Sequence, residues 1–220
     1  MLSDFENNSG GFPLAVNLLN SLRNDILSQK IKTGEKLLEQ RICNEYKVSR
    51  TPVREAFIQL ELEGLLENIP NRGAFATGFS KQDIEDIFHL RKSYEKVALK
   101  WAIERITDEE LESLNEAYEF MEFYTKRRDY QKIMNINAKF HELIYKATKN
   151  RIIYQTLMKY HSYIKPGKEG VNNNADYLDS VLLEHKNIYE SIAGKDLPAG
   201  TIAIEKHIDN LKRRYAILNP

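Results

Sequence analysis

The chain has 220 residues, and its 32 lysines and arginines balance 32 aspartates and glutamates, so its formal net charge is zero. Hydrophobic residues make up 42% and charged residues 29% of the sequence, which excludes a disordered chain and fits one large or two small folded domains. No apolar run approaches the roughly 18–20 residues that span a bilayer, and the N-terminal residues lack the features of a secretory signal. Cys43 is the single cysteine, so no internal disulfide framework is expected. The sequence thus predicts a cytoplasmic protein without a membrane partner.

The N-terminal third of the chain predicts three helices followed by a β-hairpin. Residues 1–12 are polar and are expected to form a poorly ordered leader. Apolar residues recur at helical spacing over Leu14–Leu27, and a short second helix follows. A third helix begins near Thr51-Pro52, because proline is favoured in the first turn, and ends at Gly64. Two short strands around a turn at Asn71-Arg72-Gly73 complete this part.

The rest of the chain predicts helices alone, joined by short connections and one long loop at residues 165–175. Six amphipathic segments are expected at Lys81–Ile106, Asp108–Arg127, Tyr130–Ala147, Ile152–Ile164, Asp176–Ala193 and Pro198–Leu218. The predicted fold is therefore mainly α, with a winged helix-turn-helix over residues 12–79 and an all-helical bundle over residues 80–220.

The start of the third helix has the side chains of a DNA-reading helix. Arg50 and Arg54 lie four residues apart on one face, and Ser49 and Thr51 are available for phosphates. The opposite face is expected to pack on the preceding helices through Val53, Phe57, Leu60 and Leu62. Arg72-Gly73 would form the tip of a wing at the minor groove. The alternative is an ordinary amphipathic surface helix that happens to carry two arginines.

The string Ser49-Arg50-Thr51-Pro52-Val53-Arg54-Glu55-Ala56, with Gly64-Leu65 and Arg72-Gly73 after it, resembles the DNA-binding domain of GntR-type bacterial transcription regulators. The resemblance implies that Arg50 and Arg54 contact operator bases. It also implies that Thr51 and Gly73 approach the DNA backbone or minor groove. Where some members of the family carry a further arginine, this chain has Gln40.

Three of the five histidines stand near the middle of predicted helices beside apolar residues. These are His141, His185 and His207, and Asn137 precedes the first of them by four residues on the same helix face. His161 is a further candidate for lining a cavity. The spacing alone does not show that the three histidines converge, so core or surface histidines remain the alternative.

The segments around these histidines, together with Leu90-Arg91 and Glu95, resemble the FadR-type C-terminal ligand-binding domain known as FCD. Six predicted helices suggest its shorter VanR-like branch. The resemblance implies a divalent metal, Zn or Ni, held by His141, His185 and His207, with Asn137 at the position of an aspartate ligand. It also implies a small carboxylate effector that pairs with Arg91. The alternative for this arginine is a salt bridge with Glu95.

Together these features predict a ligand-responsive transcription regulator, not an enzyme. It would bind a pseudopalindromic double-stranded DNA operator as a homodimer, and a small organic acid, with metal assistance, would control its DNA affinity. One alternative is a metal-dependent hydrolase, because three imidazoles with an open position can activate water, although no general base is clearly placed. The other is a DNA-binding protein with a metal-free or purely structural bundle.

Overall fold

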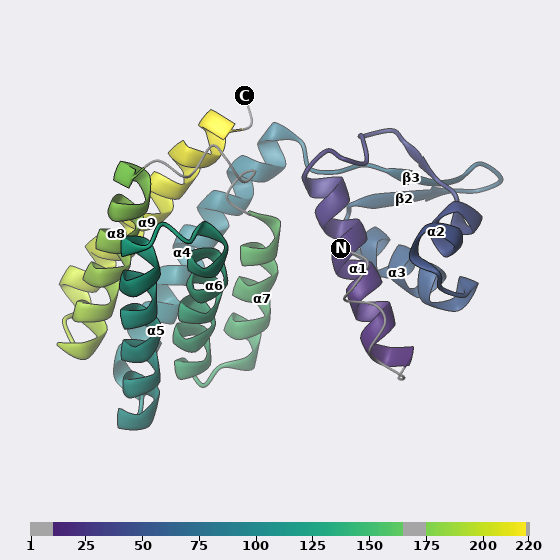
Figure 1. Cartoon of the computed structure of the whole chain (residues 1–220). Helices are drawn as coiled ribbons and strands as arrows, with labels where there is room; N and C mark the ends of the chain where they lie inside the picture. Colours follow the sequence, from purple (N-terminus) through teal and green to yellow (C-terminus); the bar gives the residue numbers. More distant parts are fainter. Residues whose placement is uncertain (1–10, 165–174, 219–220) are drawn as a thin grey trace. The chain divides into compact units, whose positions relative to one another are not determined.

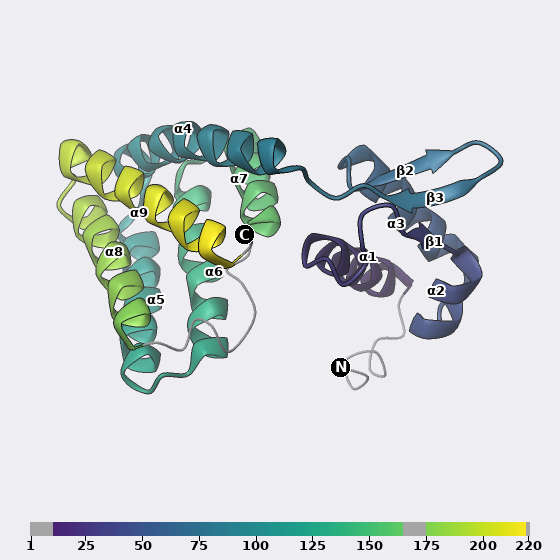
Figure 2. The same cartoon turned by 90° about the horizontal axis from the view of Figure 1, so that it is seen from above.

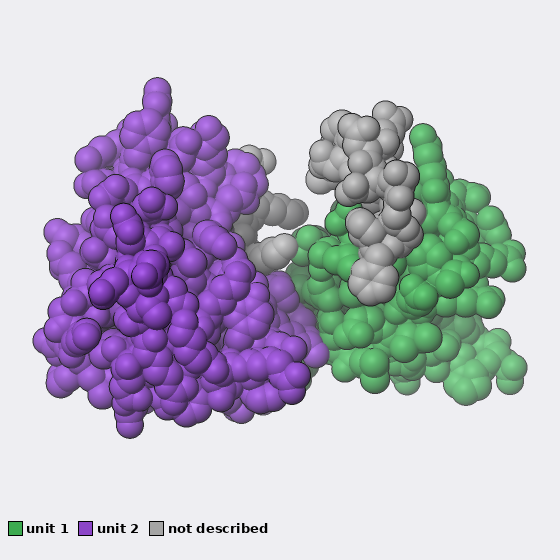
Figure 3. Space-filling view, turned by 90° about the horizontal axis from the view of Figure 1, so that it is seen from below, with its two compact units in different colours: residues 1–83 green, residues 84–220 purple. Residues whose placement is uncertain are grey.

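The computed structural model of the chain describes residues 11–164 and 175–218. The chain divides into two compact units, residues 1–83 and residues 84–220 (Figure 3). Residues 1–10 of the expected leader lie outside the described residues, and its last two positions already belong to the first helix. The expected loop at 165–175 also lies outside them, except for its last residue, which begins a helix.

The N-terminal unit consists of helices and a small antiparallel sheet (Figure 1). In chain order they are α1 Gly11–Leu27, β1 Lys36–Leu37, α2 Glu39–Tyr46, α3 Arg50–Leu62, β2 Leu66–Ile69 and β3 Gly73–Ala76. The strand order is β1-β3-β2, with Leu37 opposite Ala74 and Glu67 opposite Phe75. The hairpin was predicted, but β1 was not, because two residues are too few to show an alternating pattern.

The core of this unit comes from apolar residues that recur along α1 and α3. Every fourth residue of α1 is buried from Leu18 to Ile26, and α3 buries Val53, Phe57 and Leu60. The prediction that Leu62 packs in the same core is wrong, because its side chain is 73% exposed. Two residues after Leu60 the helix has turned by about 200°, which carries Leu62 to the opposite face.

Six helices make up the rest of the described chain, and each boundary lies within one residue of its predicted position. They are α4 Lys81–Arg105, α5 Asp108–Lys126, α6 Tyr130–Ala147, α7 Arg151–Tyr163, α8 Ala175–Ala193 and α9 Leu197–Leu218. Local signals explain this agreement. At the start of α5, for example, the Glu110 backbone N–H donates to Thr107 Oγ1 at 3.3 Å and the Thr107 N–H donates to Glu110 Oε2 at 3.1 Å, which forms a capping box.

Within the C-terminal unit α5 packs against α6 and α8, and α9 packs against α8. Figure 2 shows α4 and α9 side by side at one face of the bundle. Two ion pairs join these helices, Lys92 Nζ to Asp209 Oδ2 at 2.8 Å and Lys96 Nζ to Glu205 Oε1 at 2.8 Å. The unit has one apolar core, and it also buries several polar side chains, among them Arg91, Glu184 and three histidines. None of the described helices combines the length and apolarity that crossing a membrane requires.

Candidate DNA-reading surface and metal centre

The N-terminal end of α3 presents polar side chains to solvent. Ser49 is the N-cap residue, and Arg50, Thr51 and Arg54 are exposed. Arg50 Nη2 donates to Gln40 Oε1 at 3.0 Å on α2. An exposed contact of this kind contributes little to stability, so DNA groups can replace it. The end of α3 therefore matches the arrangement expected of a recognition helix.

The hairpin between β2 and β3 carries a second cationic surface. Arg72 is exposed, and its guanidinium carbon lies 5.7 Å from the centre of the Phe75 ring, with Lys36 Nζ 5.9 Å from the same ring. The φ angle of Gly73 is +97°, and a Cβ there would lie 3.1 Å from Lys36 Cε. Glycine thus allows a left-handed turn that other residues would adopt only with strain. The result is a narrow tip with cations on it, as a wing requires.

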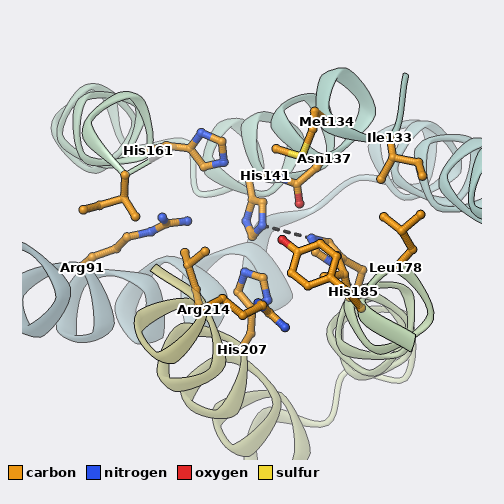
Figure 4. A pocket seen from close by; sticks show the side chains of 14 residues that line it. Arg91, Ile133, Met134, Asn137, His141, His161, Leu178, His185, His207 and Arg214 are labelled. Atoms are coloured by element: carbon orange, nitrogen blue, oxygen red, sulfur yellow. Dashed lines mark hydrogen bonds between the residues drawn. The ribbon is translucent and has the colours of Figure 1, made fainter. Parts of the chain in front are cut away.

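The three histidines that the sequence singled out meet inside the C-terminal unit. His141 comes from α6, His185 from α8 and His207 from α9, and each is at most 3% exposed. Figure 4 shows their rings facing one another. One nitrogen from each lies within 4.8 Å of the others, and the Nε2 atoms of His141 and His185 are 3.2 Å apart. The structure therefore brings the three imidazoles together, which their spacing in the sequence did not establish.

Hydrogen bonds fix the tautomers of two of these histidines. His185 Nδ1 donates to the Val181 carbonyl oxygen at 2.7 Å, and His207 Nδ1 donates to Glu184 Oε2 at 2.9 Å. Because a carbonyl and a carboxylate only accept, Nε2 of each ring keeps its lone pair. His207 Nε2 is buried and has no hydrogen-bond partner among the described residues. Metal-ligating imidazoles typically donate their other ring N–H to a protein oxygen in this way.

Burial keeps two of the three imidazoles neutral. It lowers the pKa of His141 well below its usual value, and the neighbouring His207 and His185 lower it further. Burial, with a smaller contribution from His207, lowers the pKa of His185 to about 3. Both rings are therefore unprotonated near neutral pH, which is the form that binds metals.

The donor set fits a divalent ion. Two nitrogens that each lie ~2.1 Å from one ion are at most ~4.2 Å apart, a condition that His141 and His185 meet at 3.2 Å. All three nitrogens lie within 4.8 Å of one another. The His207 ring would therefore need to move by less than about 1 Å for its nitrogen to reach the same ion. The buried unpartnered nitrogen of His207 costs about 1–3 kcal/mol unless a ligand satisfies it. Asn137 lines the same cavity and points into it (Figure 4).

Arg91 on α4 also lines this cavity and is 1% exposed. Its Nε donates to Glu95 Oε1 at 3.1 Å, and the Tyr145 hydroxyl donates to the same oxygen at 2.5 Å. The predicted alternative, a salt bridge with Glu95, is thus present. Arg91 Nη1 nevertheless remains buried without a partner among the described residues. A guanidinium N–H in this state is a donor for an anion in the cavity.

Sequence reasoning missed two residues at this site and left a third open. Arg214 lines the cavity, and Glu184 binds His207 from outside it. The available signal was weak: His207, Asn210 and Arg214 share one face of α9 at spacings of three and four residues. His161, the open candidate, lines the cavity, and its ring centre is 5.4 Å from that of His141.

Known proteins match the chain over both units. The FCD domain matches residues 86–210, and the bacterial regulatory proteins of the gntR family match residues 14–76. Over 201 residues the chain is 28% identical to YdhC of Bacillus subtilis, an uncharacterised HTH-type transcriptional regulator, covering 90% of this chain and 89% of the relative. It is 22% identical over 199 residues to the HTH-type transcriptional repressor RspR of Escherichia coli, covering 90% of this chain and 87% of that protein.

A solved structure shows the same fold. The structure of McbR/YncC from E. coli superposes with a TM-score of 0.75 at 22% identity, covering 94% of this chain and 99% of that chain. The FCD match alone spans more than half of this sequence. The chain therefore belongs to the GntR family of bacterial transcription regulators with a C-terminal FCD domain, and it is a DNA-binding regulator and not an enzyme.

Proposed function

We propose that this regulator is a homodimer on a pseudopalindromic operator and that a small organic acid, bound with a divalent metal in the FCD bundle, controls its DNA affinity. One observation carries the proposal. A single cavity is lined by three buried imidazoles and by Arg91, whose Nη1 has no partner among the described residues. These groups suit a cation and an anion side by side.

The metal would be held by His141, His185 and His207. FCD domains commonly bind metals, and a set of imidazole nitrogens suits Zn or Ni. Asn137 is the candidate fourth ligand, and its neutral amide oxygen is a weaker donor than a carboxylate. When bound, the ion supplies a positive centre that a carboxylate can ligate.

The charge of the cavity favours an anionic effector. Among the described residues, its ionisable lining side chains are Arg91, Arg214, Tyr177 and four histidines, and none of them is an aspartate or a glutamate. The cavity has a volume of about 30 Å³, which is room for about two waters. A small acid therefore fits best, and a larger one requires side chains to move.

The position of the cavity supports a regulatory role. Its lining comes from α4, α6, α7, α8 and α9. A ligand that contacts one arrangement of these helices better than another shifts the population toward it. Such a shift is the physical basis on which an acid would change DNA binding.

The N-terminal unit would read the operator through two elements. Arg50 and Arg54, with Ser49 and Thr51 beside them, would enter the major groove at the start of α3. The wing tip at Arg72-Gly73 would reach the minor groove. Phosphate contacts position such a domain, and base contacts from the arginines specify the sequence.

Dimerisation is supported by an apolar surface on α4. Leu90, Tyr94 and Val97 follow one another at helical spacing, and they are 46%, 37% and 40% exposed. Phe120 and Phe123 on α5 form a weaker candidate, because the Arg127 guanidinium carbon lies 4.9 Å from the centre of the Phe123 ring. A second copy of the chain is the occupant we assign to the α4 surface.

The alternatives predict different outcomes. A hydrolase needs a general base near the ion, yet none of the described residues that line the cavity is a carboxylate, and Glu184 is engaged by His207 and Arg214. A purely structural bundle predicts three histidines that bind no metal.

DNA binding tests the proposal. The protein is stripped of metal, reloaded with Zn or Ni, and titrated onto a duplex selected from a random library, with acetate, lactate or succinate present or absent. We expect one of the acids to change the affinity of the metal-loaded protein and not that of His185→Ala. Replacement of His89, an exposed histidine of α4, should leave the response intact. A protein that takes up neither ion, or a DNA affinity that none of the acids changes, would contradict the proposal.

A further inference from the structure

Glu184 lies behind the histidine cluster and does not line the cavity, yet its side chain is held more firmly than a surface carboxylate would be. It is 6% exposed and accepts four hydrogen bonds, all from α9. Oε2 accepts from His207 Nδ1 at 2.9 Å and from Arg214 Nη2 at 2.7 Å. Oε1 accepts from Asn210 Nδ2 at 2.7 Å and from Arg214 Nη1 at 2.8 Å. The bidentate guanidinium fixes the plane of the carboxylate.

The contacts around Glu184 decide which nitrogen of His207 carries the proton. The Arg214 guanidinium, which only donates, contacts both carboxylate oxygens, and the Asn210 amide donates to one of them. A carboxylate surrounded by donors in this way also accepts from the ring, so the proton of His207 sits on Nδ1. The opposite nitrogen, Nε2, then keeps its lone pair and is the atom left buried without a partner among the described residues.

From these contacts we infer that Glu184 is a positioning residue for the metal centre: it holds His207 in the Nδ1-protonated form with Nε2 directed at the ion. The inference rests on the proposed metal site. Because Glu184 immediately precedes His185 on α8, one turn of that helix supplies one ligand and orients another on α9. Arg214 and Asn210 keep the carboxylate in place for this task.

A purely structural role explains these contacts less well. Replacing a buried ion pair by apolar residues is often neutral or stabilising, so a buried four-bond network is not needed simply to join two helices. An ion pair between Glu184 and Arg214 alone would also leave the His207 tautomer undetermined. A role in orienting a ligand accounts for both features.

The first test uses the metal-free wild-type protein. Long-range ¹H–¹⁵N spectra at about pH 8.5, where imidazoles are neutral, report which nitrogen of His207 carries the proton. The signal is assigned by its loss in His207→Gln. We expect the proton on Nδ1, and a proton on Nε2 would overturn the inference.

The second test uses Glu184→Gln, which keeps the size of the side chain. Because the Arg214 guanidinium only donates, it should attract the glutamine oxygen and leave the NH₂ group facing His207 Nδ1. We expect the proton of His207 to move to Nε2 and the Zn affinity to fall about 10–100-fold. The matched control is Glu190→Gln on the same helix, whose side chain is 58% exposed and pairs with Lys186, and whose Zn affinity should match that of the wild type.

The outcomes separate this inference from the proposed function. Wild-type Zn affinity and an Nδ1 proton in a folded Glu184→Gln protein would overturn the role of Glu184 while leaving the metal site intact. A wild-type protein that takes up neither Zn nor Ni would overturn the metal site, whatever the tautomer. If Glu184→Gln does not fold, Asn210→Ala removes one support and keeps the charge. Its Zn affinity should then fall, and an unchanged affinity would count against the inference.

Discussion

Arg54 of α3, the proposed recognition helix, pairs with Glu39, the first residue of the preceding helix, with Arg54 Nε 2.9 Å from Glu39 Oε1 and 3.1 Å from Oε2. The arginine side chain is 61% exposed, so solvent screens the pair. In the absence of DNA the cation thus already extends from the helix in one orientation. A guanine edge offers the same kind of acceptor pair as the carboxylate.

Removing either arginine should weaken specific DNA binding. We expect Arg50→Ala and Arg54→Ala each to lower the affinity for a selected operator about 10–100-fold, because a bidentate contact to a base is lost. Fluorescence anisotropy with operator and scrambled duplexes measures this. Lys30→Ala removes an exposed cation elsewhere in the unit and should change the affinity little. Glu39→Gln keeps Arg54 and should not weaken binding. Unchanged affinity and sequence preference in both arginine variants would exclude α3 as the reading helix.

The assembly prediction concerns the apolar surface of α4. Val97→Glu places a charge in the surface that we assign to a second copy, so we expect the variant to shift toward monomer at micromolar concentration. Lys139→Glu introduces a negative charge at an exposed position on another helix, α6, and should remain dimeric. Analytical ultracentrifugation distinguishes the two states. A wild-type protein that is monomeric both free and on DNA would rule out the dimer, and a dimeric Val97→Glu would place the interface elsewhere.

Metal uptake should depend on the three imidazoles. After repletion with Zn or Ni we expect about one ion per chain in the wild type and none in His185→Ala, because a ligand is lost. Chelation should lower the melting temperature of the wild type, since an ion that binds only the folded state stabilises it. His89→Ala is the control and should keep the ion. Elemental analysis measures the ion content, and thermal melts measure the stabilisation by the ion. An ion retained in His185→Ala would count against the site.

Asn137→Asp should tighten the metal site. The substitution replaces a neutral amide oxygen by a carboxylate beside the cluster, and it adds a negative charge to a cavity whose described lining contains no carboxylate. We expect a lower Zn dissociation constant and a weaker response to added carboxylates, because the new ligand competes with them. Competition with a chromophoric chelator measures the first quantity. Equal affinities would show that residue 137 does not reach the ion.

The metal-free protein should lose stability as the pH falls below about 6.5, the usual value for histidine. Burial lowers the pKa of His185 to about 3 and that of His141 well below its usual value. Unfolded chains therefore bind protons that the folded protein does not, and stability is present above the unfolded pKa and lost as the pH falls toward the folded one. Each histidine contributes a slope of at most about 1.4 kcal/mol per pH unit.

Urea unfolding at pH 7.5 and 5.5 measures this loss. The slope should be shallower in His185→Ala and unchanged in His89→Ala. Equal wild-type stability at both pH values would contradict the burial of neutral imidazoles.

The sequence alone predicted the helices and their ends, because these depend on local features. Apolar periodicity, the Thr107–Glu110 capping box and Gly64 act within a few residues of where they stand. The cationic start of α3 could likewise be read directly, since Arg50 and Arg54 are neighbours on one helical turn. The burial of Leu62 was predicted wrongly, because a single apolar residue shows no periodicity. Strand β1 was not predicted, because two residues are too few to show an alternating pattern.

Only the tertiary structure decided how the candidate site is built. His141 and His185 are 44 residues apart, and whether their rings meet depends on how α6 and α8 pack, which no local pattern records. The same holds for Arg91, whose Nε makes the predicted salt bridge with Glu95 while its Nη1 has no partner among the described residues. Glu184 could not be recognised as a partner of His207, because its four donors come from another helix. Local sequence determines each helix, whereas the packing of several helices determines which buried polar atoms are satisfied and which remain available to bind a ligand.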